Sequence, residues 1–291
     1  MSFQYCCKNP NKYEYNIFHD GCFDNETNNL LLNCLWRLPE THSIQANCNT
    51  IFSIDTYSDY LMKLLMEKLS VTEDDVKIVT DSAGLSKNDV EFYEEEICLN
   101  CTKLVFSKSK KRITIQEFLR HLRNCIAHGR FNIVRGIFIG FDMVLDNNSN
   151  LSKYTAVIKV PFDNLSNLVT DICNIADIGD FYIMLLNDLG YLTKKENEDT
   201  ILAEKDGVKY LIKIRHYSGR YINKSDVVNF INEIDHIENK GLYFVLIVDS
   251  TYETKETKLF LQEKHVAVLD KSSLKELLTG KDLFNEICSG I

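Results

Sequence analysis

The sequence predicts a two-domain protein, with an α-helical first domain that carries a β-hairpin and an α/β second domain. Three observations support this fold class. The 291 residues suffice for about two domains of ordinary size. Apolar residues recur at helical spacing through much of residues 1–175. Within residues 176–291, short apolar runs typical of strands alternate with helical segments, so we place the domain boundary between these two ranges.

In the first domain, periodicity predicts helices near 30–36 and over 55–70, 86–99, 114–128 and 162–175. Two segments rich in Ile, Val, Phe and Tyr, 131–145 and 154–160, flank the turn-forming string DNNSNLSK. These segments predict the β-hairpin, placed directly after the 114–128 helix. Most of residues 1–50 gives no clear pattern.

The 114–128 helix has the strongest local signals. Thr114 and Glu117 have capping-box spacing, and Gly129 supplies a helix stop. One side of this helix is an apolar stripe. The other side carries polar residues, namely Arg120, Arg123, Asn124 and His128. The surrounding segment 103–130 holds eight Lys or Arg against one acidic residue, although an ordinary solvated helix face would also explain that charge.

The string RNCIAHGRF, which begins at Arg123, resembles the R-x₄₋₆-H signature of HEPN domains. In that family a polar residue, often Asn, follows the arginine. The resemblance implies an α-helical bundle that dimerises and a metal-independent endoribonuclease of a toxin or anti-phage system. Arg123, Asn124 and His128 are then the catalytic residues and RNA is the substrate. The resemblance leaves an antitoxin partner open.

The residue types suit this chemistry. When the 2′-hydroxyl of RNA attacks the adjacent phosphorus, histidine is suited to move protons near neutral pH. Arginine is suited to stabilise the charge that develops on the phosphate, and Asn124 is expected to orient the His128 imidazole. Further cations are expected to bind nucleic acid: Arg120, Arg130, Lys110, Lys111 and Arg112.

The second domain alternates helices and strands, which predicts a mixed or parallel sheet covered by helices. Helices are expected over 181–190, 224–238, 254–264 and 273–278. Strands are expected over 201–204, 208–216, 242–248 and 266–269.

This half resembles the Mrr-type restriction endonuclease domain of the PD-(D/E)xK superfamily, in the strings ILAEKDGVKYLIKIRHYSGR and FVLIVDSTYETKETKLF. Active members hold a divalent metal with an aspartate and a Glu or Gln that precedes a lysine by two residues. Here Lys213 and Arg215 occupy the latter triplet, Thr200 stands at the metal aspartate, and Asp199 lies one residue early. A lysine cannot coordinate Mg²⁺, so we expect an inactive nuclease fold. Its cations are candidates for binding a phosphate of DNA or of a nucleotide.

Composition and charge exclude several classes. Hydrophobic residues are 45% and charged residues 26% of the chain, as in soluble globular proteins. The longest apolar run, over 242–248, is too short for a membrane span, and no signal-peptide pattern begins the chain, so we expect a cytoplasmic protein without membrane contact. A formal net charge of −9 argues against non-specific coating of nucleic acid.

The ten cysteines are expected to be free thiols in a reducing compartment. Cys98 and Cys101 have C-x-x-C spacing, but a zinc site needs a second pair or two histidines at ligand spacing. The downstream His121 and His128 are seven residues apart. Another group is equally irregular: Cys6, Cys7, His19 and Cys22. We therefore expect no metal and no cofactor, and the role of the C-x-x-C pair stays open.

Three hypotheses remain. The first is a homodimeric HEPN endoribonuclease whose degenerate second domain senses nucleic acid or another ligand. The second is a non-catalytic scaffold that binds nucleic acid. The third and weaker one is a DNA endonuclease that acts through Asp199 in a shifted register.

Overall fold

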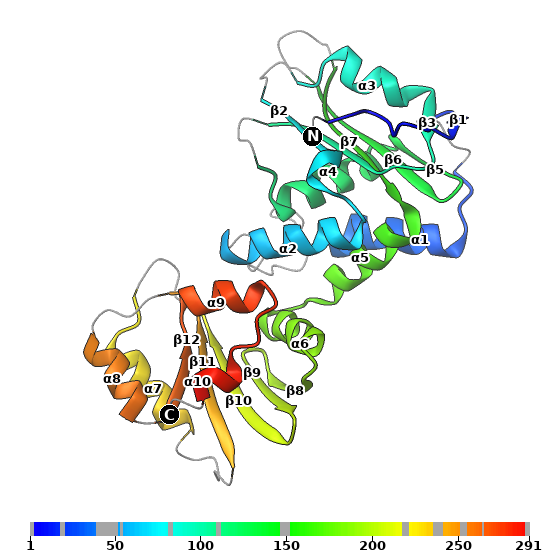
Figure 1. The fold of residues 1–291 in the computed structure, drawn as a ribbon. Coiled ribbons are helices and arrows are strands. Elements are labelled where there is room, and N and C mark those ends of the chain that lie inside the picture. The colour runs from blue at the N-terminus through cyan, green and yellow to red at the C-terminus, as the bar shows by residue number, and fades with distance from the viewer. Residues whose placement is uncertain are drawn as a thin grey trace. The chain divides into compact units, whose positions relative to one another are not determined.

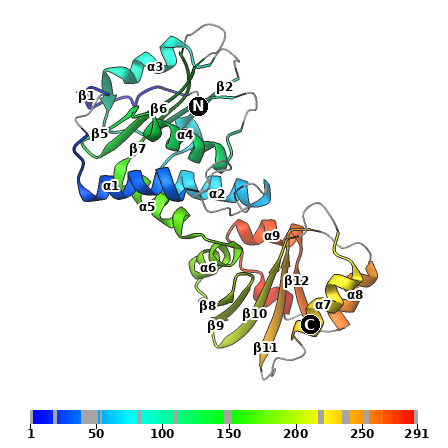
Figure 2. The same cartoon turned by 180° about the vertical axis from the view of Figure 1, so that it is seen from behind.

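The structure is a computed structural model, and its chain forms two compact units, residues 1–174 and 175–291 (Figures 1 and 2). The residues that the structure describes are 3–17, 21–38, 52, 55–80, 84–108, 112–145, 152–216, 221–234, 241–250, 255–263 and 265–288.

The first unit is built on a five-stranded sheet with the order β2-β4-β7-β6-β5. Its strands are β2 (Val76–Val79), β4 (Lys103–Ser107), β5 (Phe131–Val134), β6 (Ile137–Leu145) and β7 (Ser152–Pro161). The β2–β4 pair is parallel and the other pairs are antiparallel. A second sheet pairs β1 (Lys12–Glu14) with β3 (Glu96–Cys98).

Helices cover both faces of the larger sheet (Figure 1). They are α1 (Asn25–Leu32), α2 (Asp55–Lys68), α3 (Lys87–Glu94), α4 (Ile115–Ala127) and α5 (Phe162–Asn174). A π-helical turn (Asn33–Arg37) continues α1, and a 3-10 turn (Glu73–Asp75) precedes β2. On β6, Gly140 and Asp142 face α4, whereas Ile139 and Phe141 pack in a core shared with Tyr93 of α3.

The first unit is therefore a mixed α and β structure built on a five-stranded sheet, and the helical bundle with an inserted β-hairpin that we expected is not confirmed. The predicted hairpin is present as β6 and β7, but the segment 131–145 is divided. Arg135 and Gly136 have φ of 50° and 79°, so they form a tight turn between the antiparallel strands β5 and β6. The expected 86–99 helix ends at Glu94 and the chain continues into β3.

Helix α4 has the capping box, the apolar face and the glycine stop that its sequence predicts. The Thr114 hydroxyl accepts a hydrogen bond from the Glu117 amide (3.2 Å), and the Glu117 carboxylate accepts one from the Thr114 amide (2.9 Å). Gly129 ends the helix with a φ of 63°. Its buried face contains Ile115, Phe118, Leu119, His121, Leu122, Cys125 and Ile126. At about 1.5–3 kcal/mol for each fully buried large apolar side chain, this packing fixes α4 on the sheet.

The second unit contains a five-stranded sheet with the order β12-β11-β10-β9-β8. Its strands are β8 (Leu192–Asn197), β9 (Thr200–Lys205), β10 (Val208–Arg215), β11 (Leu242–Val248) and β12 (Val266–Leu269). Strands β10, β11 and β12 are parallel, while β8, β9 and β10 are antiparallel. The helices are α6 (Ile178–Asp188), α7 (Lys224–Ile234), α8 (Lys255–Glu263), α9 (Lys271–Leu278) and α10 (Phe284–Cys288).

The mixed sheet of this unit confirms the expected α/β class. Alternating residues of β10 serve two cores. Leu211 packs with Phe230 and Ile231 of α7, and Tyr210 packs against Phe284 of α10 on the other face. Strand β8 was missed because its sequence, LTKKEN, is polar and mostly exposed, as suits the edge of a sheet. Among the described helices, none has the length and apolar content needed to cross a membrane.

Candidate functional site

Helix α4 presents the R-x₄-H motif at its C-terminal end. Arg123 and Asn124 lie on the last turn and are half-buried, while His128 is the C-cap and is exposed. The His128 backbone amide donates to the Asn124 carbonyl at 3.1 Å, so the backbone of the motif is held in a closed helical turn. The imidazole thus lies on the surface at a backbone position that the helix defines.

A buried polar cluster lies under this turn. Its centre is Asp142 of β6, which is fully buried. Asp142 Oδ2 accepts hydrogen bonds from His121 Nδ1 (2.6 Å), Thr155 Oγ1 (2.9 Å) and Asn124 Nδ2 (3.3 Å). Burial raises the pKa of the Asp142 carboxyl, but the hydrogen bond from His121, together with those from Thr155 and Asn124, outweighs burial and lowers that pKa.

This cluster connects to the surface through Arg120. Arg120 Nη2 lies 3.2 Å from His121 Nε2. A guanidinium can only donate and a carboxylate can only accept, so His121 carries its proton on Nδ1 and accepts at Nε2. The chain from Arg120 through His121 to Asp142 therefore ties the exposed face of α4 to the centre of the sheet.

The structure differs from one expectation about the motif. The Asn124 carboxamide donates to Asp142, and within the described residues no hydrogen bond joins it to the His128 ring. Sequence reasoning also missed the contribution of His121 and Thr155. Two signals were available, namely a histidine on the apolar stripe of α4 and a lone aspartate in the apolar string IFIGFDMVL.

Of the five cations of the first unit that we expected to bind nucleic acid, the structure describes three. Arg120 is exposed, Arg130 is half-buried, and Arg112 is exposed with Asp59 at 3.5 Å. Lys110 and Lys111 lie outside the described residues. Two other cations of the same segment are in ion pairs. Lys103 contacts Asp75 at 2.6 Å and Lys108 contacts Glu117.

A groove of about 810 Å³ runs beside α2 and β2. Its lining includes Lys63, Glu67 and Arg112, and none of the motif residues. In a single chain the motif therefore lies outside this groove, on the surface at the end of α4.

The second unit brings together the four residues of the expected vestigial nuclease site. Lys213 Nζ lies 2.7 Å from Asp199 Oδ1 and 3.0 Å from Thr200 Oγ1. Arg215 Nη1 lies 2.7 Å from Asp199 Oδ2. The structure adds Glu233 of α7, which was missed because it follows Arg215 by 18 residues, and its carboxylate oxygens lie 2.8 and 2.9 Å from Arg215 Nη2.

This arrangement does not fit a Mg²⁺ site. Mg²⁺ needs several oxygen ligands at near-octahedral geometry, whereas Asp199 and Glu233 are engaged by two cations. Equally, the two carboxylates offset the positive charge of Lys213 and Arg215. The cluster is therefore an ion-pair network of two cations and two carboxylates.

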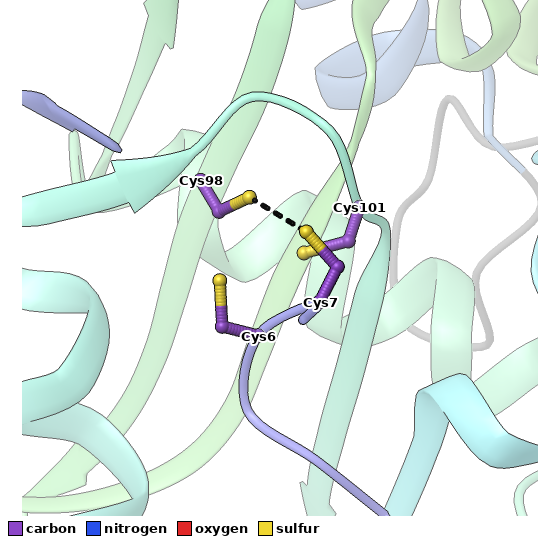
Figure 3. Close-up of side chains that lie close together, drawn as sticks. All are labelled: Cys6, Cys7, Cys98 and Cys101. Atoms are coloured by element: carbon purple, nitrogen blue, oxygen red, sulfur yellow. Dashed lines mark hydrogen bonds between the residues drawn. The ribbon is translucent and has the colours of Figure 1, made fainter. Parts of the chain in front are cut away.

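Four cysteines of the first unit converge, although their sequence spacing predicted no metal site (Figure 3). The Sγ atoms of Cys6, Cys7, Cys98 and Cys101 all lie within 4.8 Å of one another. We call this group the cysteine cluster. The second pair that the C-x-x-C motif lacked is two adjacent cysteines 91 residues earlier, a separation that local spacing cannot reveal. Of the irregular group considered above, Cys22 does not belong to the cluster and His19 lies outside the described residues.

Comparison with known proteins gives one family match. Residues 13–178 match the family model described as HEPN pEK499 p136. No curated protein matches the chain. Among solved structures, protein VC1899 from Vibrio cholerae is 9% identical with a TM-score of 0.28, covering 89% of this chain and 56% of that chain. MspJI restriction endonuclease in complex with a 27-mer oligonucleotide is 7% identical with a TM-score of 0.23. The match covers 65% of this chain and 64% of that chain. The chain thus spans less than two thirds of either structure.

Proposed function

The chain belongs to the HEPN pEK499 p136 family, and we propose that it is a metal-independent endoribonuclease whose α4 motif cuts RNA. The observation that carries this proposal is the placement of Arg123 and His128 on the last turn and cap of a helix fixed by seven buried side chains. Packing of the buried face of α4 fixes the backbone positions of Arg123 and His128, while the His128 side chain stays accessible to a substrate.

In the proposed reaction, the ribose 2′-oxygen attacks the adjacent phosphorus and the bond from phosphorus to the 5′-oxygen breaks. One imidazole accepts the 2′-hydroxyl proton, and an imidazolium delivers a proton to the leaving 5′-oxygen. The Arg123 guanidinium stabilises the charge on the phosphoryl oxygens. The products are a 2′,3′-cyclic phosphate and a 5′-hydroxyl, and no oxidant or metal is consumed.

We further propose that two copies of the chain form this site. One chain supplies one His128 and one Arg123, whereas the reaction uses an acid and a base together. A homodimer with facing α4 ends would supply two of each. Light scattering that shows a strictly monomeric species, still active on RNA, would contradict the dimer.

The role that we propose for Asn124 is positioning. Its side chain binds Asp142, so it anchors the last turn of α4 to β6. Asn124→Ala should therefore lower RNA cleavage less than His128→Ala does, because it removes an anchor and leaves both reacting groups in place.

The test compares purified wild type with His128→Ala and Arg123→Ala on a mixed RNA substrate in excess EDTA. We expect cleavage by the wild type and a loss of at least about 100-fold in either variant, the scale of acid–base and electrostatic contributions. Arg135→Ala is the matched control, since this arginine is exposed and lies in the β5–β6 turn. Equal cleavage by all four proteins would rule out the site. No cleavage by the wild type, together with RNA binding, would favour the non-catalytic scaffold.

As a toxin or anti-phage effector, the wild type is expected to arrest growth when induced in a bacterial host, and His128→Ala is not.

For the second unit we propose a non-catalytic sensing role, because its Lys213 and Arg215 pair with the acidic groups. Metal-dependent DNA nicking that disappears in Asp199→Ala would overturn that role and support the DNA endonuclease.

A further inference from the structure

We propose that the cysteine cluster binds one zinc ion through four thiolates, and that this zinc fastens the N-terminal segment, residues 3–17, to the turn between β3 and β4. The site belongs to the first unit and shares no residue with the α4 motif. It adds a structural metal to a protein whose proposed reaction uses none.

The size of the cage formed by the four sulfurs fits a zinc ion. Zinc in structural sites is tetrahedral with Zn–S distances of about 2.3 Å, which places the sulfurs about 3.8 Å apart. The four Sγ atoms lie within 4.8 Å of one another, and those of Cys7 and Cys98 are 3.5 Å apart. Figure 3 shows the four side chains pointing toward one another from two separate segments. Such a cage matches a single tetrahedral cation, for which an all-sulfur ligand set favours zinc.

The backbone around the cluster also supports a metal site. Cys98 is the last residue of β3 and Cys101 lies in the turn before β4. The Asn100 amide donates to Cys98 Sγ at 3.4 Å, an outer hydrogen bond of the kind that stabilises and orients a metal-bound thiolate. The Leu99 amide donates to the Asn11 carbonyl at 2.9 Å, and β1 pairs with β3. Main-chain hydrogen bonds thus already align the two segments that carry the ligands.

A buried positive charge lies beside the cluster. Lys159 of β7 is fully buried, and its Nζ donates to the Cys101 carbonyl and to Cys101 Sγ, the latter at 3.1 Å. Within the described part of the chain, no carboxylate lies within ion-pair distance of this ammonium. A buried ammonium requires a counter-charge. Four thiolates at −1 and Zn²⁺ at +2 leave a net charge of −2, which supplies that counter-charge, whereas four neutral thiols do not.

The consequence of binding is local stability. Tyr5, which precedes the first cysteine pair, hydrogen-bonds Asp89 (2.5 Å), and Tyr93 donates to the Tyr5 carbonyl (2.9 Å). Lys159 belongs to the sheet face that α3 covers, because it follows Val157 by two residues and Val157 packs in the α3 core. The α4 motif lies over the opposite face. Zinc loss should therefore release the N-terminal segment first and affect the α4 motif only indirectly.

The direct measurement is the metal content of the full chain, purified under reducing conditions without chelator. We expect about one zinc ion per chain for the wild type and for Cys22→Ser, which changes an exposed cysteine outside the cluster. Cys7→Ser and Cys98→Ser should each retain less than about one fifth of that amount. Equal zinc in all four proteins, or stoichiometric iron in place of zinc, would overturn the proposal.

If the cysteine variants do not fold, the wild type alone decides. X-ray absorption at the zinc edge should show about four sulfur neighbours at about 2.3 Å. A mixed nitrogen and oxygen shell would overturn the proposal, as would a folded, reduced wild type that takes up no zinc from added ZnCl₂. A third result would also overturn it: folded, metal-free protein with disulfides among the cluster cysteines that still binds no zinc after those disulfides are reduced.

Lys159→Met separately tests whether the Lys159 charge contributes to zinc affinity. Methionine keeps much of the lysine volume but has no charge, so zinc affinity in a chelator competition should fall by about 10–100-fold, the scale of outer-shell changes at zinc sites. Circular dichroism checks that the variant is folded. An unchanged affinity in the folded variant would contradict the role assigned to this ammonium.

Discussion

Replacing Asp142 with alanine should destabilise the first unit more than any other single polar change beneath α4. The carboxylate is fully buried and accepts three hydrogen bonds, from His121, Thr155 and Asn124. Removing one partner of a buried charged network costs about 3–5 kcal/mol. Part of that cost is offset, because Asp142 Oδ1 is itself buried without a hydrogen-bond partner within the described residues. We therefore expect a net loss of about 3 kcal/mol.

The assay is urea or thermal unfolding followed by tryptophan fluorescence, since the single tryptophan, Trp36, belongs to the first unit. A loss of about 3 kcal/mol corresponds to a drop in Tm of about 6–12 °C for a unit of this size. Thr155→Val is the matched control. It removes one of the three hydrogen bonds and should cost about 1 kcal/mol. A wild-type midpoint for Asp142→Ala, or an equal loss in the control, would refute the reasoning.

Two other changes test packing and electrostatics in the same unit. A Cβ on Gly140 would lie 2.9 Å from a Phe138 ring carbon and 3.0 Å from Cys125 Cβ. Gly140→Ala should therefore lower the free energy of unfolding by about 1–3 kcal/mol in the same assay. An unchanged free energy of unfolding would show that α4 can move away from β6. Burial raises the pKa of Asp89, but donors led by Lys77 outweigh it and lower the pKa to about 2 from the ordinary 3.8. The pKa of Asp89 is lower in the folded state than in the unfolded state. Asp89 therefore contributes about 2 kcal/mol to the free energy of unfolding above about pH 4, and this contribution is lost as the pH falls toward 2. Unfolding midpoints measured across that range should decline less in Asp89→Asn, and equal slopes would contradict the assignment.

The features that the sequence predicted well are those that local residues determine. The cap at Thr114, the apolar stripe of α4 and the stop at Gly129 all lie within one helix, and all three are present. The alternation of helices and strands in the second unit is equally local. Strands β9 and β10 are antiparallel neighbours, and their pairing register puts Lys213 opposite Thr200.

The features that the sequence did not predict depend on contacts between distant residues. Strands β2 and β4 are four and five residues long and are stabilised by pairing within the sheet, so their local patterns were too short to distinguish. Asp142 meets His121 across 21 residues, and Cys7 meets Cys98 across 91. No spacing rule connects such pairs, and only the folded sheet brings them together.

The central claim is that the α4 motif cuts RNA by attack of the ribose 2′-hydroxyl without a metal. The most direct measurement uses one RNA that the wild type cuts and the same RNA with a single 2′-deoxynucleotide at the cleaved position, both in excess EDTA. We predict that the first is cut to a 2′,3′-cyclic phosphate and a 5′-hydroxyl, and that the second stays intact at that position. Equal cleavage of both, or products that end in a 3′-hydroxyl, would contradict the mechanism.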